Sequence, residues 1–132
     1  MRLLLDTHLL IWAAGTYAGP ASPMSREADA MIDDPANILC FSPASIWEVA
    51  IKHAQGRPDF GTDPQALRRA LLDNGYVEIP ITSEHTAAVS FLPPIHKDPF
   101  DRLLVAQARI EGVTLLTADA KVAEYGGPIR RI

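Results

Sequence analysis

Cysteine is almost absent from the sequence, since Cys40 is the only one among 132 residues and no disulfide can form within the chain. It lies in the short apolar run 38–41, as is typical of a small core residue in a reducing compartment. No apolar run approaches the roughly 20 residues that a membrane-spanning helix needs. Asp6 and His8 interrupt the apolar N-terminus too early for a signal peptide. We therefore expect a cytoplasmic protein without a membrane attachment.

The sequence also lacks an excess of basic residues, because 12 Lys and Arg stand against 16 Asp and Glu, a net charge of −4. No overall positive potential attracts nucleic acid, so a polyanionic substrate would require local basic groups or metal ions. Apolar residues at 48% and charged residues at 21% exclude a disordered chain. Internal repeats, linkers and low-complexity segments are missing as well. We expect one domain over residues 1–132, long enough to bury one core.

Short apolar runs alternate with helical patterns along the chain. Strands are expected at 2–5, 38–41, 76–79, 113–116 and, as an edge strand, 129–132. Four helix starts share a Ser or Asp N-cap followed by proline: Ser22-Pro23, Ser42-Pro43, Asp63-Pro64 and Asp98-Pro99. Further helices are expected at 9–14, from Thr82 to the Pro93-Pro94 pair, and after Asp119. This alternation predicts an α/β fold in which helices cover both sides of a parallel sheet of four to five strands.

The stretch 96–108 holds the most informative of these helices. Asp98 and Pro99 begin it, apolar residues recur at helical spacing, and Gly112 is placed to end it. The helix is therefore expected to be mostly buried, yet Asp101 and Arg102 lie in its first turn. Asp101 alone has a plain explanation, since an acid in that turn favours the helix dipole by about 0.3–1 kcal/mol.

Acidic residues from distant parts of the sequence are expected to meet at one edge of the sheet, because ligands of open parallel sheets bind outside the carboxyl ends of the strands. Asp6 ends the first strand, and Thr117 and Asp119 follow the fourth. Glu48 lies in the helix that leaves the second strand. Together with Asp101, these segments bring four acids to the same edge.

Each acid taken alone has a structural explanation. Asp6 could start an Asx turn, Glu48 could form a surface ion pair with Lys52, and Asp98 and Asp119 could be helix caps. Together, however, they would repel one another unless cations bound between them. Several carboxylates favour Mg²⁺ or Mn²⁺ over zinc, for which no Cys/His spacing exists. Two such ions roughly 3.5–4 Å apart would activate water and stabilise the leaving oxygen of a phosphodiester; the sequence leaves one ion or two open.

Four segments resemble PIN-domain proteins, and most of all the VapC-type toxins of type II toxin–antitoxin systems. They are Leu-Leu-Asp6-Thr7-His8, Ser42-Pro43-Ala44-Ser45-Ile46-Trp47-Glu48-Val49-Ala50-Ile51-Lys52, His96-Lys97-Asp98-Pro99-Phe100-Asp101-Arg102 and Leu116-Thr117-Ala118-Asp119. The resemblance implies a three-layer α/β/α sandwich and a Mg²⁺- or Mn²⁺-dependent endoribonuclease that is the toxin of such a pair.

The resemblance also implies roles for particular residues. The family's catalytic and metal-binding acids fall on Asp6, Glu48, Asp101 and Asp119, and its supporting hydroxyls on Thr7 and Thr117. Asp98 matches a recurrent acid whose role as a metal ligand or only as a helix cap stays open. The expected partners are a cognate antitoxin, an RNA substrate and a second copy of the chain in a homodimer.

Contacts to substrate are predicted with less support from the pattern. Lys52, Arg102 and His96 are candidates to bind phosphate, as are Arg57, Arg68 and Arg69. Three aromatic residues, Trp12, Trp47 and Phe60, could stack on bases or dock an antitoxin, but core packing is the favoured explanation. The RNA sequence or structure that is cut is not predicted, because recognition of single-stranded RNA depends on pocket shape and stacking.

There are three alternatives to a ribonuclease. A phospho-acceptor domain needs a pair of acids early in the chain, but Asp6 stands alone there. A haloacid-dehalogenase-type phosphatase is disfavoured because His8 stands two positions after Asp6. The third alternative is a PIN scaffold that binds RNA or protein without cleaving, which the intact acids disfavour and only a cleavage assay decides.

Overall fold

A computed structural model describes residues 1–15 and 23–132, and its centre is a five-stranded sheet. The strands are β1 (Arg2–Leu5), β2 (Ile38–Phe41), β3 (Val77–Glu78), β4 (Thr114–Thr117) and β5 (Ile129–Arg131). Every neighbouring pair is parallel, in the order β3-β2-β1-β4-β5. The predicted α/β class and parallel sheet are confirmed.

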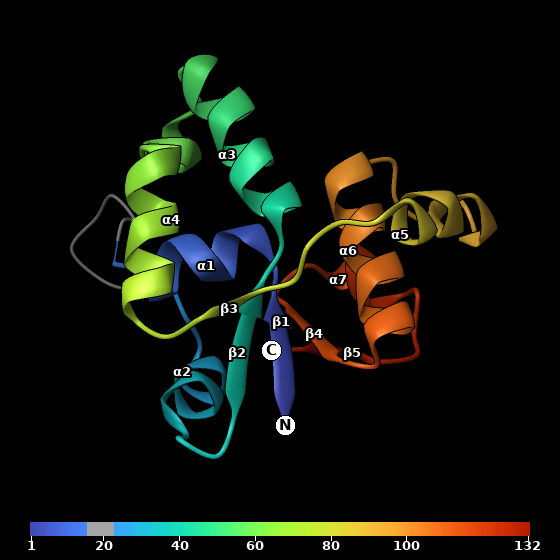
Figure 1. Cartoon of the computed structure of the whole chain (residues 1–132), viewed down its shortest axis with the longest axis horizontal. Coiled ribbons are helices and arrows are strands. Elements are labelled where there is room, and N and C mark those ends of the chain that lie inside the picture. The colour runs from blue at the N-terminus through green and yellow to red at the C-terminus, as the bar shows by residue number, and fades with distance from the viewer. Residues whose placement is uncertain (16–22) are drawn as a thin grey trace.

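Helices cover both faces of this sheet. They are α1 (Thr7–Ala13), α2 (Arg26–Asp33), α3 (Pro43–Ala54), α4 (Pro64–Asp73), α5 (Ser83–Ala88), α6 (Pro99–Glu111) and α7 (Ala120–Ala123), with 3₁₀ turns η1 (Pro58–Phe60) and η2 (Val89–Phe91). Figure 1 shows α1, α2 and α4 on one side of the strands and α5, α6 and α7 on the other, while α3 rises from the end of β2. The three-layer sandwich is therefore confirmed.

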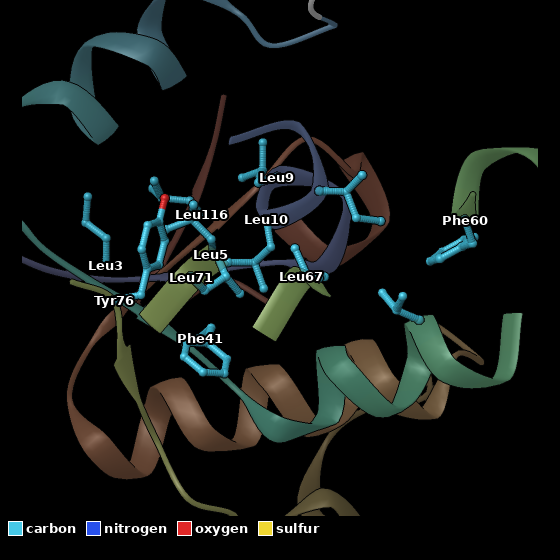
Figure 2. Close-up of a cluster of buried hydrophobic side chains, with 12 residues drawn as sticks. Leu3, Leu5, Leu9, Leu10, Phe41, Phe60, Leu67, Leu71, Tyr76 and Leu116 are labelled. Atoms are coloured by element: carbon cyan, nitrogen blue, oxygen red, sulfur yellow. The ribbon is translucent and has the colours of Figure 1, made fainter. Parts of the chain in front are cut away.

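Alternate residues of the central strand enter two separate cores, because successive side chains of a strand point to opposite faces. Leu3 and Leu5 pack in the cluster that α1 and α4 cover, which Figure 2 shows. Leu4 packs in the other cluster, with Leu104 and Val105 of α6. The strand is thus apolar on both faces, as a central parallel strand must be.

Three of the four predicted Ser/Asp-Pro caps are confirmed. Ser42, Asp63 and Asp98 each accept hydrogen bonds from N–H groups in the first turn of the helix that follows. The prediction at Ser22-Pro23 is wrong: α2 begins at Arg26, and Ser22 itself lies outside the described residues. Ser25 is the N-cap there because its Oγ accepts the N–H of Ala28 at 3.1 Å.

Other predicted boundaries differ by a few residues. The first helix starts at Thr7 and not at residue 9, because Asp6 caps it by accepting the N–H of Leu9 at 3.1 Å. β3 is limited to Val77–Glu78, and β4 lies one residue later than predicted. Within the described residues, no helix is long and apolar enough to cross a membrane.

The strand order creates a topological switch point beside β1. From β1 the chain continues to β2 and β3 on one side, and later returns to β4 and β5 on the other. Connections that leave two adjacent parallel strands in opposite directions open a crevice at their carboxyl ends. Here those ends are Leu5 of β1 and Thr117 of β4, which are followed by Asp6 and Asp119.

Candidate metal centre

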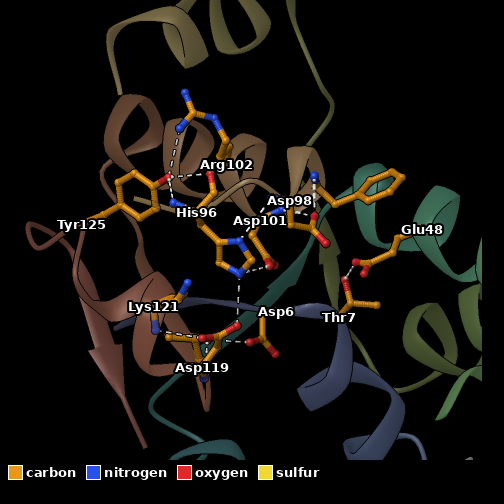
Figure 3. A network of polar contacts seen from close by, with 12 residues as sticks. Asp6, Thr7, Glu48, His96, Asp98, Asp101, Arg102, Asp119, Lys121 and Tyr125 are labelled. Atoms are coloured by element: carbon orange, nitrogen blue, oxygen red, sulfur yellow. Dashed lines mark hydrogen bonds and ion pairs between the residues drawn. The ribbon is translucent and has the colours of Figure 1, made fainter. Parts of the chain in front are cut away.

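A cavity of about 160 Å³ lies at the carboxyl ends of β1 and β4. The four predicted acids and Asp98 all line this cavity. Its lining residues are Asp6, Thr7, His8, Glu48, Lys52, His96, Asp98, Asp101 and Asp119. Figure 3 shows most of these side chains converging from α1, α3, α6 and the start of α7. The predicted gathering of acids at one edge of the sheet is what the structure shows.

Asp6 is buried at the start of α1, with 7% of its surface exposed. One carboxylate oxygen accepts the N–H of Leu9, and the other accepts the hydroxyl of Thr117 at 2.7 Å. Burial raises the pKa of Asp6, although these two donors offset part of the effect. Thr117, predicted as a supporting hydroxyl, thus contacts Asp6 directly.

Glu48 lies in α3 and is also buried, with 4% of its surface exposed. Its Oε1 accepts the hydroxyl of Thr7 at 2.6 Å, and its Oε2 lies 2.5 Å from the Lys52 ammonium. The Thr7 oxygen lies 3.0 Å from the hydroxyl of Ser45 as well. The Glu48–Lys52 pair is therefore a buried contact at the wall of the cavity, and not an ion pair on an open surface.

Asp98 and Asp101 have different surroundings although one helix turn carries both. Asp98 Oδ1 accepts the N–H groups of Phe100 at 2.8 Å and Asp101 at 3.1 Å, so Asp98 is the cap of α6. Burial, followed by the charges of Asp98, Glu48 and other nearby acids, raises the pKa of Asp101 to about 8. Asp101 thus holds its proton near neutral pH until a cation offsets this repulsion.

Asp119 is the most exposed of the four acids and caps α7. Its Oδ1 accepts the N–H of Lys121 at 2.8 Å, and its Oδ2 lies 3.3 Å from Nε2 of His96. Partial burial raises the pKa of Asp119, but the hydrogen bonds from the Lys121 N–H and from His96 outweigh burial, so the net pKa is lowered. Asp119 and Asp101 therefore contact the same nitrogen of His96, with pKa values that are shifted in opposite directions.

Among the predicted phosphate contacts, Lys52, His96 and Arg102 lie in different places. Lys52 and His96 line the cavity. Arg102 donates instead to the carbonyl oxygens of Pro93 and Val89 and to the hydroxyl of Tyr125, at 3.0, 3.1 and 3.0 Å. Its guanidinium is thus used to fix the chain that leads into α6.

The donor set of the cavity suits a small divalent cation. His96 Nε2 and one carboxylate oxygen each from Asp101 and Asp119 lie within 4.8 Å of one another, and of these groups the two carboxylates are the ligands that such a cation prefers. Asp6 and Glu48 add carboxylates to the same cavity. Oxygen-rich sites of this kind favour Mg²⁺ or Mn²⁺. Burial and then like charges raise the pKa of Asp101, and such a cation would neutralise those charges.

Two features of this region were not foreseen from the sequence. Tyr125 accepts the N–H of His96 at 3.0 Å, yet its spacing from the acids gives no signal of this contact. Among the aromatic residues, core packing is confirmed for Phe60, which is fully buried, but is wrong for Trp47, which is 61% exposed. Trp47 and Phe100 form a T-shaped pair with ring centroids 5.2 Å apart.

The parallel sheet, its switch point and the carboxylate cavity define an α/β domain with a candidate centre for divalent cations. The chain belongs to the PIN-domain family, whose model matches residues 3–128. PIN domains are generally nucleases that use divalent metal. No curated protein sequence matches the chain significantly.

Three similar solved structures share the fold at low sequence identity. A chain of the VapBC2 complex of Rickettsia felis, bound to a promoter DNA fragment, has a TM-score of 0.68 and 16% identity, over 99% of this chain and 98% of that one. A toxin–antitoxin complex from Klebsiella pneumoniae gives 0.62 and 20%, over 98% and 99%. FitAcB from Neisseria gonorrhoeae gives 0.57 and 16%, over 93% and 91%.

Proposed function

We propose that this chain is a Mg²⁺- or Mn²⁺-dependent endoribonuclease and the toxin of a toxin–antitoxin pair. The observation that carries the proposal is the convergence of Asp6, Asp101 and Asp119 on one cavity at the carboxyl ends of β1 and β4. Membership of the PIN-domain family and similarity to chains solved in toxin–antitoxin complexes support it.

The residues that line this site have different roles. Asp6, Glu48, Asp101 and Asp119 hold the cation through their carboxylates, and Thr117 keeps Asp6 oriented by its hydrogen bond. Bound Mg²⁺ or Mn²⁺ supplies neutralisation of the phosphodiester and activation of water for its hydrolysis.

Thr7 has the corresponding orienting role at the other wall, because its hydroxyl holds Glu48. Lys52 is the residue of this wall that would bind a substrate phosphate, since it lines the cavity with its ammonium beside Glu48 and 3.6 Å from Asp98. Asp98 is used as a helix cap, and we assign it no direct metal contact.

A cleavage assay with matched variants tests the nuclease proposal. Purified protein should cut single-stranded RNA in Mg²⁺ or Mn²⁺ and stop in EDTA, and Asp6→Asn and Asp101→Asn should abolish cutting. Asp73→Asn is the control, because Asp73 is an exposed acid at the end of α4. Cleavage that persists undiminished in EDTA would reject the metal mechanism. RNA binding without cleavage in either metal would favour the alternative of a binding module. Sequencing the 5′ ends of the products would identify the RNA.

The antitoxin would cover an apolar recess next to the metal centre. The recess has a volume of about 250 Å³, and Trp47 and Phe100 form part of its wall. Its lining residues are Trp47, Thr86, Val89, Pro99, Phe100 and Leu103. Trp47 immediately precedes Glu48 and Phe100 immediately precedes Asp101, so the two helices that carry these acids also form the recess. An apolar segment followed by a basic side chain complements both surfaces.

Co-expression experiments test this assignment of the partner. Induction of the gene alone should arrest growth, and Asp6→Asn should relieve the arrest. Trp47→Ala should weaken capture of the co-encoded antitoxin while leaving cleavage by the free protein intact. Loss of RNA cleavage in Trp47→Ala would instead assign the recess to RNA. The implied homodimer is tested separately by light scattering of the free protein.

A further inference from the structure

The His96 ring bridges two acids of the cavity that belong to different elements. Its Nε2 lies 3.3 Å from Oδ2 of Asp101 in α6 and 3.3 Å from Oδ2 of Asp119 at the start of α7. The side chain is only 19% exposed, and Figure 3 shows it between the two carboxylates. A single ring nitrogen therefore links two parts of the site that the backbone does not connect locally.

A second contact of the ring fixes which nitrogen carries the proton. Nδ1 accepts the backbone N–H of Asp98 at 3.1 Å. A ring nitrogen that accepts a hydrogen bond must present its lone pair, so the proton of the neutral imidazole is on Nε2. The Nε2–H group consequently donates to the Asp119 carboxylate, and Oδ2 of Asp101 lies at the same distance of 3.3 Å from Nε2.

The backbone of His96 is held as firmly as its ring. Its N–H donates to the hydroxyl of Tyr125 at 3.0 Å, and that hydroxyl donates back to the carbonyl of His96 at 3.4 Å. Arg102 also donates to the Tyr125 hydroxyl at 3.0 Å. With partners on both its backbone and its ring, His96 is placed before any ligand binds.

This pattern is the reverse of that of a metal-ligating histidine. Such a histidine presents a lone pair to the metal and donates its other N–H to an acceptor. His96 instead accepts at Nδ1 and donates at Nε2. The imidazole is therefore set up to orient carboxylates.

We propose that His96 is a positioning residue of the metal centre: it donates through Nε2–H to Asp119, contacts Asp101 with the same nitrogen and fixes the spacing of the two carboxylates, without itself binding the cation. The inference rests on the proposed metal site. Partners that orient the ligands of a metal commonly contribute 10–100-fold to its affinity. His96 links α6 to the loop after β4, so its loss frees Asp119 to turn towards solvent.

The state of the ring can be measured without activity. Two-bond ¹H–¹⁵N correlation spectra of the labelled protein should show His96 with its proton on Nε2 in EDTA and again in saturating Mg²⁺. A proton on Nδ1 in either condition would overturn the proposal. Pulsed EPR of the Mn²⁺ complex should show no ¹⁵N coupling from His96, because a nitrogen that carries a proton cannot coordinate the ion.

Variants at this position test the consequence for the cation. His96→Ala should lose 10–100-fold in Mn²⁺ affinity by EPR titration, whereas His96→Gln, whose amide can donate to the same carboxylates, should stay close to the wild type. His53→Ala is the control, since His53 contacts the carbonyl of Phe60 and none of the acids. The positioning role would be refuted if His96→Ala kept its Mn²⁺ affinity, or if His96→Gln lost as much Mn²⁺ affinity as His96→Ala while its circular dichroism stayed intact. Neither outcome would contradict the proposed function. Failure of the wild type to bind Mn²⁺ would contradict the proposed function itself.

Discussion

Thr117 donates a hydrogen bond to the carboxylate of Asp6 at 2.7 Å, although 111 residues separate the two in the sequence. The same hydroxyl oxygen accepts the N–H of Asp119 at 3.0 Å. One fully buried side chain at the end of β4 thus joins the acid that follows β1 to the acid that begins α7. Because the hydroxyl donates one hydrogen bond and accepts another, its removal leaves both the Asp6 carboxylate oxygen and the Asp119 N–H without this partner.

Thr117→Val should therefore lower the free energy of unfolding by about 1–3 kcal/mol, the usual cost of leaving a buried polar group without a partner. Valine has nearly the same shape, so packing stays the same and the hydroxyl is the variable. Thr117→Ser keeps the hydroxyl and serves as the control. Urea unfolding in EDTA provides the measurement, and equal stability of the valine variant and the wild type would contradict the assigned role.

The raised pKa of Asp101 predicts a pH dependence of stability in the metal-free protein. Burial and neighbouring acids raise this pKa from 3.8 to about 8, so the folded state binds more protons than the unfolded state between these values. The free energy of unfolding must then fall as the pH rises through that window. Asp101→Asn removes this loss, and its melting temperature in EDTA should exceed that of the wild type by more at pH 8 than at pH 5.

Added Mg²⁺ separates this effect from a change of packing. A cation that binds the folded state alone stabilises the wild type and replaces the proton of Asp101, whereas the asparagine variant lacks that charge and should gain less. If the difference in melting temperature between Asp101→Asn and the wild type were the same at every pH, Asp101 would not titrate in this range.

The Lys52–Glu48 pair predicts that the protein loses stability when Lys52 is removed and Glu48 remains. Burial lowers the pKa of Lys52, but the hydrogen bond and charge of Glu48 outweigh burial and raise it overall. A raised lysine pKa adds stability that is fully present below pH 10.5 and disappears as the pH rises through the folded value. Lys52→Met should cost about 1–3 kcal/mol at pH 7, because a buried carboxylate then lacks its cation.

The double variant Lys52→Met/Glu48→Gln is the matched comparison for this pair. Replacing both charges removes the unpaired carboxylate, so the double variant should recover most of the stability that Lys52→Met loses. Chemical unfolding of the wild type, the two single variants and the double variant gives the coupling energy directly. Strictly additive losses would show that the two side chains act independently.

Much of the fold is predictable because its signals are local. The caps at Ser42, Asp63 and Asp98 follow from a side-chain acceptor before a proline, and that chemistry needs only a few adjacent residues. The gathering of Asp6 and Asp119 follows from a general property of parallel sheets, whose strand ends lie at one edge. Both kinds of inference use the chain order and require no side-chain coordinates.

The remaining details depend on contacts between distant residues. Nothing near Tyr125 in the sequence indicates that its hydroxyl holds the His96 backbone, because the two are 29 residues apart. Arg102, next to an acid in the sequence, resembled a phosphate contact, but backbone carbonyls before α6 accept its hydrogen bonds. The apolar neighbours of Trp47 in the sequence predict a core residue, although 61% of its surface is exposed.

The two acids at the start of α6 give the sharpest prediction, because their roles separate stability from activity. Asp98 caps the helix through its Oδ1, which asparagine can replace, so Asp98→Asn should keep the fold and most cleavage. Asp98→Ala should cost about 0.5–2 kcal/mol through the lost cap. Asp63→Ala, which removes the same Asp-Pro cap from α4, should cost a similar amount and leave cleavage intact. Thermal melts in EDTA and cleavage rates in Mg²⁺ are measured for every variant. If Asp98→Asn loses cleavage as completely as Asp101→Asn while staying stable, Asp98 binds the cation and its role extends beyond the cap.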